Sequence, residues 1–139
     1  MAELNTSASG ARIIGAADPR NEGPGPRLMG SSTLVGNEVV NRQGERLGTI
    51  AEIMLDVPRG RIAYAVLSSG GFLGIGDRMF ALPWRALTLD TENKCFVLDV
   101  AMARLEAAPG FDKNQWPAMA DEQWSMQVHR YYGQPPYWE

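Results

Sequence analysis

The one histidine of the chain, His129, is the side chain best suited to act as a base near neutral pH. On a helix over Asp121–Tyr131 it would lie one turn from Ser125 and two turns from Asp121, the residue types of an acid–base cluster. A hydrolase also needs an activated nucleophile, and a lone histidine has no plausible nucleophile beside it. We therefore expect His129 to lie on a solvated helix face. We predict that the protein is not an enzyme and has no catalytic residues.

The serines and the single cysteine do not change this prediction. Ser68 and Ser69 follow an apolar run, but a nucleophile elbow would need glycine where Val66 stands and a helix after the serine. We expect both to be hydroxyls at the end of a strand. Cys95 begins an apolar segment and is expected to be a small core residue. One cysteine cannot form an internal disulfide, which fits a reducing, cytoplasmic compartment.

The glycine-rich stretch from Gly70 to Gly76 shares only part of the pattern of a phosphate-binding loop. A dinucleotide fingerprint needs a third glycine, where Met79 stands, and a helix after it. The segment instead predicts a tight connection between strands. Because one histidine and one cysteine leave almost no metal-site spacing, and no calcium-loop pattern occurs, we predict no cofactor and no metal.

Composition bounds the remaining classes. The 139 residues are 45% hydrophobic and 21% charged, which is ordinary for one globular domain. The formal net charge is −3, and residues 33–100 carry seven basic against eight acidic residues, so no direct nucleic-acid binding is expected. No apolar run approaches the roughly 18 residues of a membrane span, and no secretory signal is visible. Six arginines could still gather on one side of a small barrel: Arg42, Arg46, Arg59, Arg61, Arg78 and Arg85.

Three segments differ in composition. In residues 1–32, 12 of 32 residues are Ser, Gly or Pro, which predicts a mostly mobile N-terminal arm. Its exception is Arg12-Ile13-Ile14-Gly15, which could pair as a short edge strand. Residues 33–100 contain short apolar runs separated by turn signals, the pattern of an all-β domain. Residues 101–139 form a C-terminal extension.

Two-residue alternation places six strands in residues 33–100. The second, Leu47 to Leu55, carries Thr49, Ala51, Ile53 and Leu55 on one face. It is followed by a type I turn at residues 57–60. The third, Ile62 to Ser68, is apolar on both faces and should be central. The other strands are Val39-Val40, Arg78 to Leu82, Leu87-Thr88-Leu89 and Phe96-Val97-Leu98.

The C-terminal extension combines two helices with most of the aromatic residues. Helices are predicted over Met102–Ala107 and Asp121–Tyr131. The extension holds seven of the twelve aromatic residues, and because each buried ring is worth roughly 1.5–3 kcal/mol, we expect it to dock on its own barrel or on another subunit. The candidate contact residues of the extension are Trp124, Tyr131, Tyr137 and Trp138.

Many short strands with glycine turns predict a small, mostly antiparallel β-barrel that closes its own edges. The motifs that sharpen this prediction are Leu34-Val35-Gly36, Gly44-Glu45-Arg46-Leu47-Gly48-Thr49-Ile50, Ile62-Ala63-Tyr64-Ala65-Val66-Leu67-Ser68, Gly70-Gly71-Phe72-Leu73-Gly74-Ile75-Gly76-Asp77 and Phe80-Ala81-Leu82-Pro83-Trp84. In order and spacing they resemble the PRC-barrel family, named after the cytoplasmic domain of the photosynthetic reaction centre H subunit. The ending Tyr131-Tyr132-Gly133…Pro136-Tyr137-Trp138 is similar to the tail of stand-alone bacterial members.

The resemblance implies a compact barrel that works through protein contacts and has no general catalytic residues. The sequence thus predicts a non-enzymatic protein-interaction module, self-associating and with an unknown protein partner. Exposed apolar residues of the glycine-rich loop, Phe72, Leu73 and Ile75, are further candidate contacts, although they could equally fold back as a barrel lid. Two alternatives stay open: an adaptor for ribosomal or RNA-bound complexes, and a small hydrolase assembled at an oligomer seam.

Overall fold

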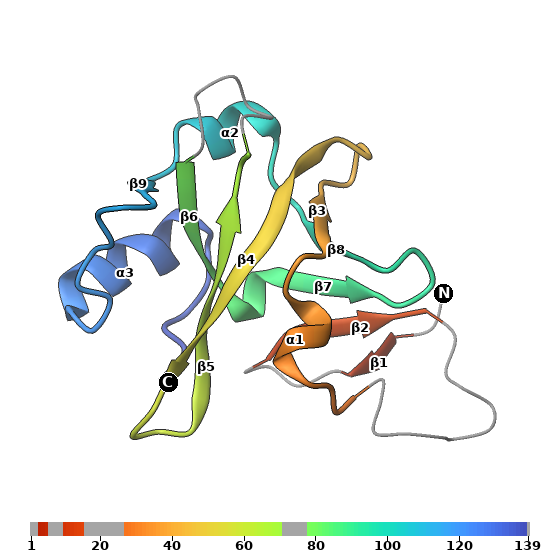
Figure 1. The fold of residues 1–139 in the computed structure, drawn as a ribbon, viewed down its shortest axis with the longest axis horizontal. Coiled ribbons are helices and arrows are strands. Elements are labelled where there is room, and N and C mark those ends of the chain that lie inside the picture. Colours follow the sequence, from red (N-terminus) through yellow and green to blue (C-terminus); the bar gives the residue numbers. More distant parts are fainter. Residues whose placement is uncertain (1–2, 6–9, 16–26, 71–77, 139) are drawn as a thin grey trace.

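A computed structural model describes residues 3–5, 10–15, 27–70 and 78–138. Nine strands form one strongly curled sheet in the order β1-β2-β7-β8-β3-β4-β5-β6-β9 (Figure 1). The strands are β1 (Glu3–Asn5), β2 (Arg12–Ile14), β3 (Glu38–Val40), β4 (Arg46–Asp56), β5 (Arg61–Ser68), β6 (Arg78–Pro83), β7 (Leu87–Asp90), β8 (Cys95–Leu98) and β9 (Phe111–Asp112). The helices are α1 (Ser31–Leu34), the 3-10 turn η1 (Trp84–Ala86), α2 (Met102–Glu106) and α3 (Glu122–Tyr131).

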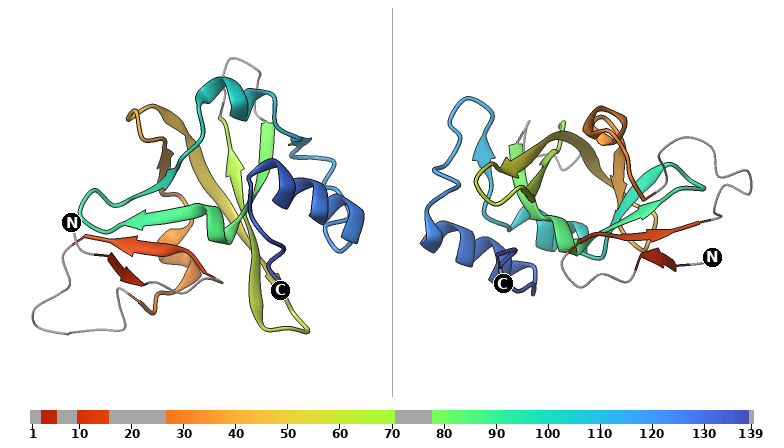
Figure 2. Two further views of the ribbon diagram at one scale, coloured as in Figure 1. Left: turned by 180° about the vertical axis from the view of Figure 1, so that it is seen from behind. Right: turned by 90° about the horizontal axis from the view of Figure 1, so that it is seen from below.

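The predicted mostly β, mostly antiparallel fold class is confirmed. The predicted closure of the sheet into a barrel is not. The pairings of β2 with β7 and of β3 with β8 are parallel, and the remaining pairings are antiparallel. Within the described residues, β1 lies at one end of the order and β9 at the other, with no pairing between them. The sheet curls far round (Figure 2), yet its hydrogen-bonded order is open.

The antiparallel strands β4, β5 and β6 form the body of the sheet, and the β4–β5 hairpin projects beyond it (Figure 1). As predicted, β5 is central and is buried from Ala63 to Leu67. At the hairpin tip, the Gly60 N–H donates to the Asp56 carbonyl over 2.9 Å. Gly60 has φ +65°, a conformation that favours glycine.

The predicted orientation of Leu55 in β4 is wrong. Strict alternation predicted that it shares a face with Ile53, but Ile53 is buried and Leu55 is 63% exposed. The pairing of β4 with β5 shifts register between Ile50 and Glu52, and again between Met54 and Leu55. Each irregularity moves the following side chains relative to the two faces of the sheet, so a period of two does not hold along β4.

The Arg12–Gly15 segment pairs as predicted, but not at the edge. Strand β2 lies between β1 and β7, and Ala11 and Ile13 are buried. Thr91 fixes its end, since both the backbone N–H and the hydroxyl of Thr91 donate to the Ile14 carbonyl over 2.9 and 3.1 Å. Part of the predicted N-terminal arm therefore contributes to the described sheet.

Two hydrophobic clusters lie on opposite sides of β5 and β6. We call the cluster on the concave side the inner core; its largest fully buried residues are Leu47, Ile50, Leu67, Phe80, Leu82, Leu87, Phe96, Leu98 and Leu105. We call the second cluster the outer layer; it comprises Ala63, Tyr64, Ala81 and Val128, with Met54, Phe111, Met119, Trp124, Tyr132 and Tyr137 packed against them. Helix α3 lies outside the curled sheet and covers this second side (Figure 2).

Candidate functional site

His129 is a buried structural residue of α3 and does not lie on a solvated face. Its side chain is 1% exposed, so the predicted environment is wrong. Helix α3 begins at the N-cap Asp121, whose carboxylate accepts from the Gln123 N–H, and turns Ser125, Val128 and His129 toward the sheet. The apolar stripe of the helix was visible in the sequence, but the inclusion of a histidine in its buried face was not.

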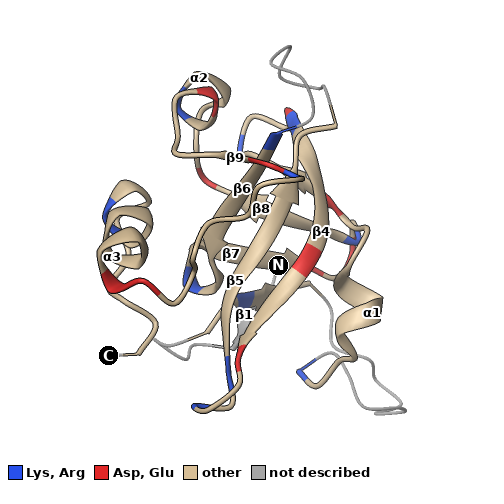
Figure 3. Ribbon diagram, turned by 60° about the vertical axis from the view of Figure 1, so that its left-hand side comes forward, with Lys and Arg blue, Asp and Glu red and all other residues tan. Residues whose placement is uncertain are grey.

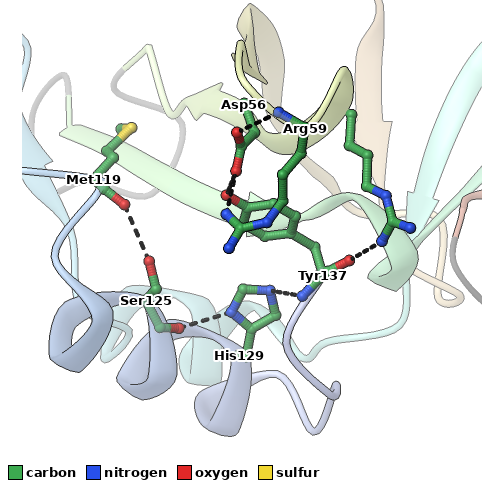
Figure 4. Close-up of polar contacts among 7 residues, drawn as sticks. Asp56, Arg59, Met119, Ser125, His129 and Tyr137 are labelled. Atoms are coloured by element: carbon green, nitrogen blue, oxygen red, sulfur yellow. Dashed lines mark hydrogen bonds and ion pairs between the residues drawn. The ribbon is translucent and has the colours of Figure 1, made fainter. Parts of the chain in front are cut away.

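Both nitrogens of the His129 ring are engaged. Nδ1 lies 2.7 Å from the Ser125 carbonyl oxygen, which can only accept, so Nδ1 carries the proton. Nε2 accepts the Tyr137 N–H over 3.2 Å. Burial lowers the pKa of His129, and the nearby Arg85 guanidinium lowers it further. The imidazole is therefore neutral and joins α3 to the C-terminal residues (Figure 4).

The other members of the hypothetical acid–base cluster are also in structural use. The Ser125 hydroxyl donates to the Met119 carbonyl over 3.0 Å, and Asp121 caps the helix. Neither the Ser125 hydroxyl nor the Asp121 carboxylate forms a hydrogen bond to the His129 side chain among the bonds of the described residues. The geometry thus gives this cluster the role of a helix anchor rather than that of a charge-relay system.

The C-terminal residues lie against their own sheet. The Tyr137 hydroxyl donates to Asp56 Oδ2 at the end of β4, and Arg61 Nη1 donates to the Tyr137 carbonyl over 3.0 Å. The Tyr137 ring stacks on His129 with centroids 5.9 Å apart and meets Tyr64 edge-on at 5.9 Å. Figure 4 shows Tyr137 between α3 and the hairpin. Tyr137 therefore connects three elements far apart in the sequence.

Asp56 is the polar centre of the hairpin. Arg59 Nη1 lies 2.8 Å from Asp56 Oδ2, and the Arg59 N–H donates to Oδ1 over 3.1 Å. The hydrogen bond from Tyr137 lowers the pKa of Asp56, as does the one from Arg59. Burial raises the pKa of Tyr137, and the Asp56 carboxylate raises it further. At neutral pH the carboxylate is ionised and the phenol holds its proton.

An open cavity of about 470 Å³ lies between the hairpin and the C-terminal segment. Met54, Leu55, Val57 and Pro58 line it from the hairpin side, and Met119, Ala120, Glu122, Ser125, Tyr137 and Trp138 from the other. Tyr64 of β5 also contributes, and burial raises the pKa of its phenol to about 12. At the rim, Leu55 is 63% and Val57 83% exposed, so large apolar side chains face solvent beside a hollow.

A family model of the PRC-barrel domain matches residues 26–103, more than half of the chain. The chain belongs to the PRC-barrel domain family. The comparison with curated proteins finds no match. The match includes the β4–β5 hairpin but ends before α3, so the cavity has one wall in the PRC-barrel domain and the other in the C-terminal segment.

The predicted contact residues fall into three groups. Trp138 lines the cavity with Tyr137, while Trp124 meets Tyr64 edge-on with centroids 5.4 Å apart. Tyr131 lies elsewhere: its hydroxyl donates to the Arg104 carbonyl over 2.6 Å, and the Arg104 guanidinium lies 4.4 Å from its ring centroid. Phe72, Leu73 and Ile75 lie outside the described residues.

Residues of the hairpin were missed as site residues. The sequence signal that could have found them is Val57, an apolar residue at the start of the predicted turn, separated from Leu55 only by Asp56. In the structure the Val57 side chain is exposed. What the sequence did not contain was the bulge that turns Leu55 outward, and the return of the chain end to Asp56.

Three further observations concern metal sites, membrane spans and the arginines of the described residues. No group of three or more His, Cys, Asp or Glu side chains there could hold a metal ion. No helix in the described ranges is long and apolar enough to cross a membrane. Three of the six candidate arginines pair with carboxylates: Arg42 with Asp99, Arg46 with Glu38 and Arg59 with Asp56. Basic and acidic segments are interspersed along the ribbon (Figure 3).

Proposed function

We propose that this PRC-barrel protein is a non-enzymatic protein-interaction module, and that its contact surface is the cavity between the β4–β5 hairpin and the C-terminal segment. One observation carries the proposal: two large apolar side chains, Leu55 and Val57, are exposed at the rim of a mainly apolar cavity. Burying such a side chain completely is worth about 1.5–3 kcal/mol, so a partner that covers both gains a substantial part of its affinity there.

We also propose that the protein has no catalytic activity. His129, Ser125 and Asp121 each hold the fold together through hydrogen bonds. Burial raises the pKa of the Cys95 thiol, which keeps it in the protonated form that is a poor nucleophile. The free thiol also fits the cytoplasmic location that we propose.

Self-association is the finer part of the proposal. Tyr137 and Trp138 pack within their own chain, so exposed Leu55 and Val57 are the better anchors for contact between two copies. Light scattering at micromolar concentration tests this part alone. A monomer there contradicts the homodimer and leaves the module free for a different partner.

A tagged pull-down from the native cell tests the interaction surface. The wild-type chain is compared with the double substitution Leu55→Ser and Val57→Ser, and with Leu28→Ser as the matched control. Leu28 is 72% exposed but does not line the cavity. We expect a protein, identified by mass spectrometry, that the wild type and the control retain and the double variant loses. Equal retention by all three, with equal melting temperatures, contradicts the proposal.

A further inference from the structure

We infer that the cavity accepts a basic side chain of the partner, with its aliphatic stem along the apolar walls and its cationic head beside Glu122 and the Tyr137–Trp138 ring pair. This inference rests on the proposed function and adds the chemistry of the partner.

The walls suit a long unbranched stem. Met54 and Met119 face the cavity from opposite sides, and methionine adapts its shape to a flexible aliphatic chain. A volume of about 470 Å³ is ample for one lysine or arginine side chain, and pockets of this size hold small ligands. An apolar stem would exclude water from the methionines without leaving a polar group unpaired.

The aromatic rings supply a favourable place for a cation. The Tyr137 and Trp138 rings meet edge to face at 86° with centroids 5.1 Å apart, and both residues line the cavity. The face of an aromatic ring carries negative electrostatic potential and attracts ammonium and guanidinium groups. A neutral or anionic head would gain nothing from such a ring face.

Charge complementarity points the same way. Three charged residues line the cavity: Asp56, Arg59 and Glu122. Asp56 and Arg59 neutralise each other at 2.8 Å. Glu122 has no ion pair within the described ranges, so the lining carries one uncompensated negative charge. The start of α3 is visibly acidic (Figure 3).

The dipole of α3 does not cancel this charge. A helix N-terminus carries about half a positive charge. Asp121 and Glu122, in contrast, place two carboxylates at the first turn, so the end of the helix remains net negative. An anionic head would be repelled by this negative charge and would be disfavoured.

The test uses n-pentylammonium as the probe, because it reproduces the stem and head of lysine. The full-length protein, labelled with ¹⁵N, is titrated with n-pentylammonium, with 1-pentanol and with pentanoate, and amide shifts around Glu122 and Trp138 are followed. We expect pentylammonium to bind about three- to fivefold more tightly than pentanol, the gain of one partly exposed ion pair. Pentanoate should bind more weakly than either.

The variant Glu122→Gln should remove that difference, whereas Glu106→Gln, an exposed glutamate on α2 outside the cavity, should preserve it. Equal binding of pentylammonium and pentanol by the wild type overturns the inference and leaves the apolar contact surface intact. Shifts from none of the three probes at tens of millimolar also overturn it. The pull-down with Leu55→Ser and Val57→Ser then decides the proposed function independently.

Discussion

The inner core and the outer layer lie on opposite sides of the same two strands but are built differently. The inner core is aliphatic around Phe80 and Phe96, and its members come mainly from strands between Val39 and Leu98. The outer layer is rich in aromatic rings and lies beside the buried His129, and six of its ten members come from residues 111–137. The inner core consists of packed apolar side chains, mainly from the residues that match the family. The outer layer depends on the C-terminal segment, which adds hydrogen bonds such as the one from the Tyr137 N–H to His129.

The difference separates the part that stabilises the fold from the part that forms the proposed contact surface. A close-packed aliphatic core has no room for a ligand and no polar group to recognise one. The outer layer has rings, charges and an open cavity, and it depends on the chain end to hold them in place. The PRC-barrel domain supplies a stable wall, and the C-terminal segment supplies the second wall of the cavity that we propose as the contact surface.

The inner core should be the more costly side to disturb. Phe96 is fully buried and meets Trp84 edge-on with centroids 5.9 Å apart. We expect Phe96→Ala to lower the free energy of unfolding by about 3–5 kcal/mol, because it leaves a large cavity. Urea denaturation measures this loss. Trp116→Ala, at a ring that is 41% exposed, is the control and should cost far less. If Phe96→Ala and Trp116→Ala lowered the free energy of unfolding equally, the inner core would not be the more costly side to disturb.

A chain that ends at Gly133 should lose the contacts that join the C-terminal residues to the hairpin and to α3. It lacks Tyr137 and Trp138, both half-buried, and the buried Pro136. We expect a loss of about 2–3 kcal/mol, since two partly buried rings are returned to water. Calorimetry measures the melting temperature, and light scattering on the same sample tests whether the oligomeric state changes. An unchanged melting temperature would show that the C-terminal residues do not stabilise the outer layer.

His129→Leu should weaken the outer layer without removing a chain segment. It leaves the Tyr137 N–H without its acceptor, and an unsatisfied buried group costs about 1–3 kcal/mol before relaxation. We expect a net loss of about 1–3 kcal/mol in urea denaturation. Gln127→Leu, an exposed position on the same helix, should be nearly neutral. A loss from the control as large as from His129→Leu would indicate a general effect on α3.

The same histidine should make stability depend on pH. Burial lowers the pKa of His129 below its ordinary 6.5, so below that pH the unfolded chain binds a proton that the folded one excludes. The contribution is complete above pH 6.5 and decreases as the pH falls below it. Since the chain has one histidine, this slope should vanish in His129→Leu. Identical pH profiles for the two proteins would contradict a buried neutral imidazole.

The inner core could be predicted far better than the outer layer. Local alternation identified the strands β5 and β7–β8. The spacing of Trp124, Val128 and Tyr131, with Gly133 after the end, identified α3. The two residues whose environments were predicted wrongly, Leu55 and His129, depend on contacts with residues distant in the sequence. Leu55 faces outward because of a bulge in pairing with β5, and His129 is buried because Tyr137 returns to cover it. Neither cause has a signal within its own neighbourhood of the sequence.

The N-terminal residues should show the smallest effect. Deleting residues 1–10 removes β1, which pairs only with β2 and lies at the end of the sheet order. It spares Ala11 and Ile13, which are buried where β2 pairs with β7. We therefore expect a change in melting temperature below about 2 °C, corresponding to a few tenths of a kcal/mol. A deletion of residues 1–14 is the matched comparison and should cost clearly more, because it exposes the flank of β7. If the shorter deletion already lowers the melting temperature by several degrees, β1 is a structural strand of the domain, and the inner core extends further toward the N-terminus than β2.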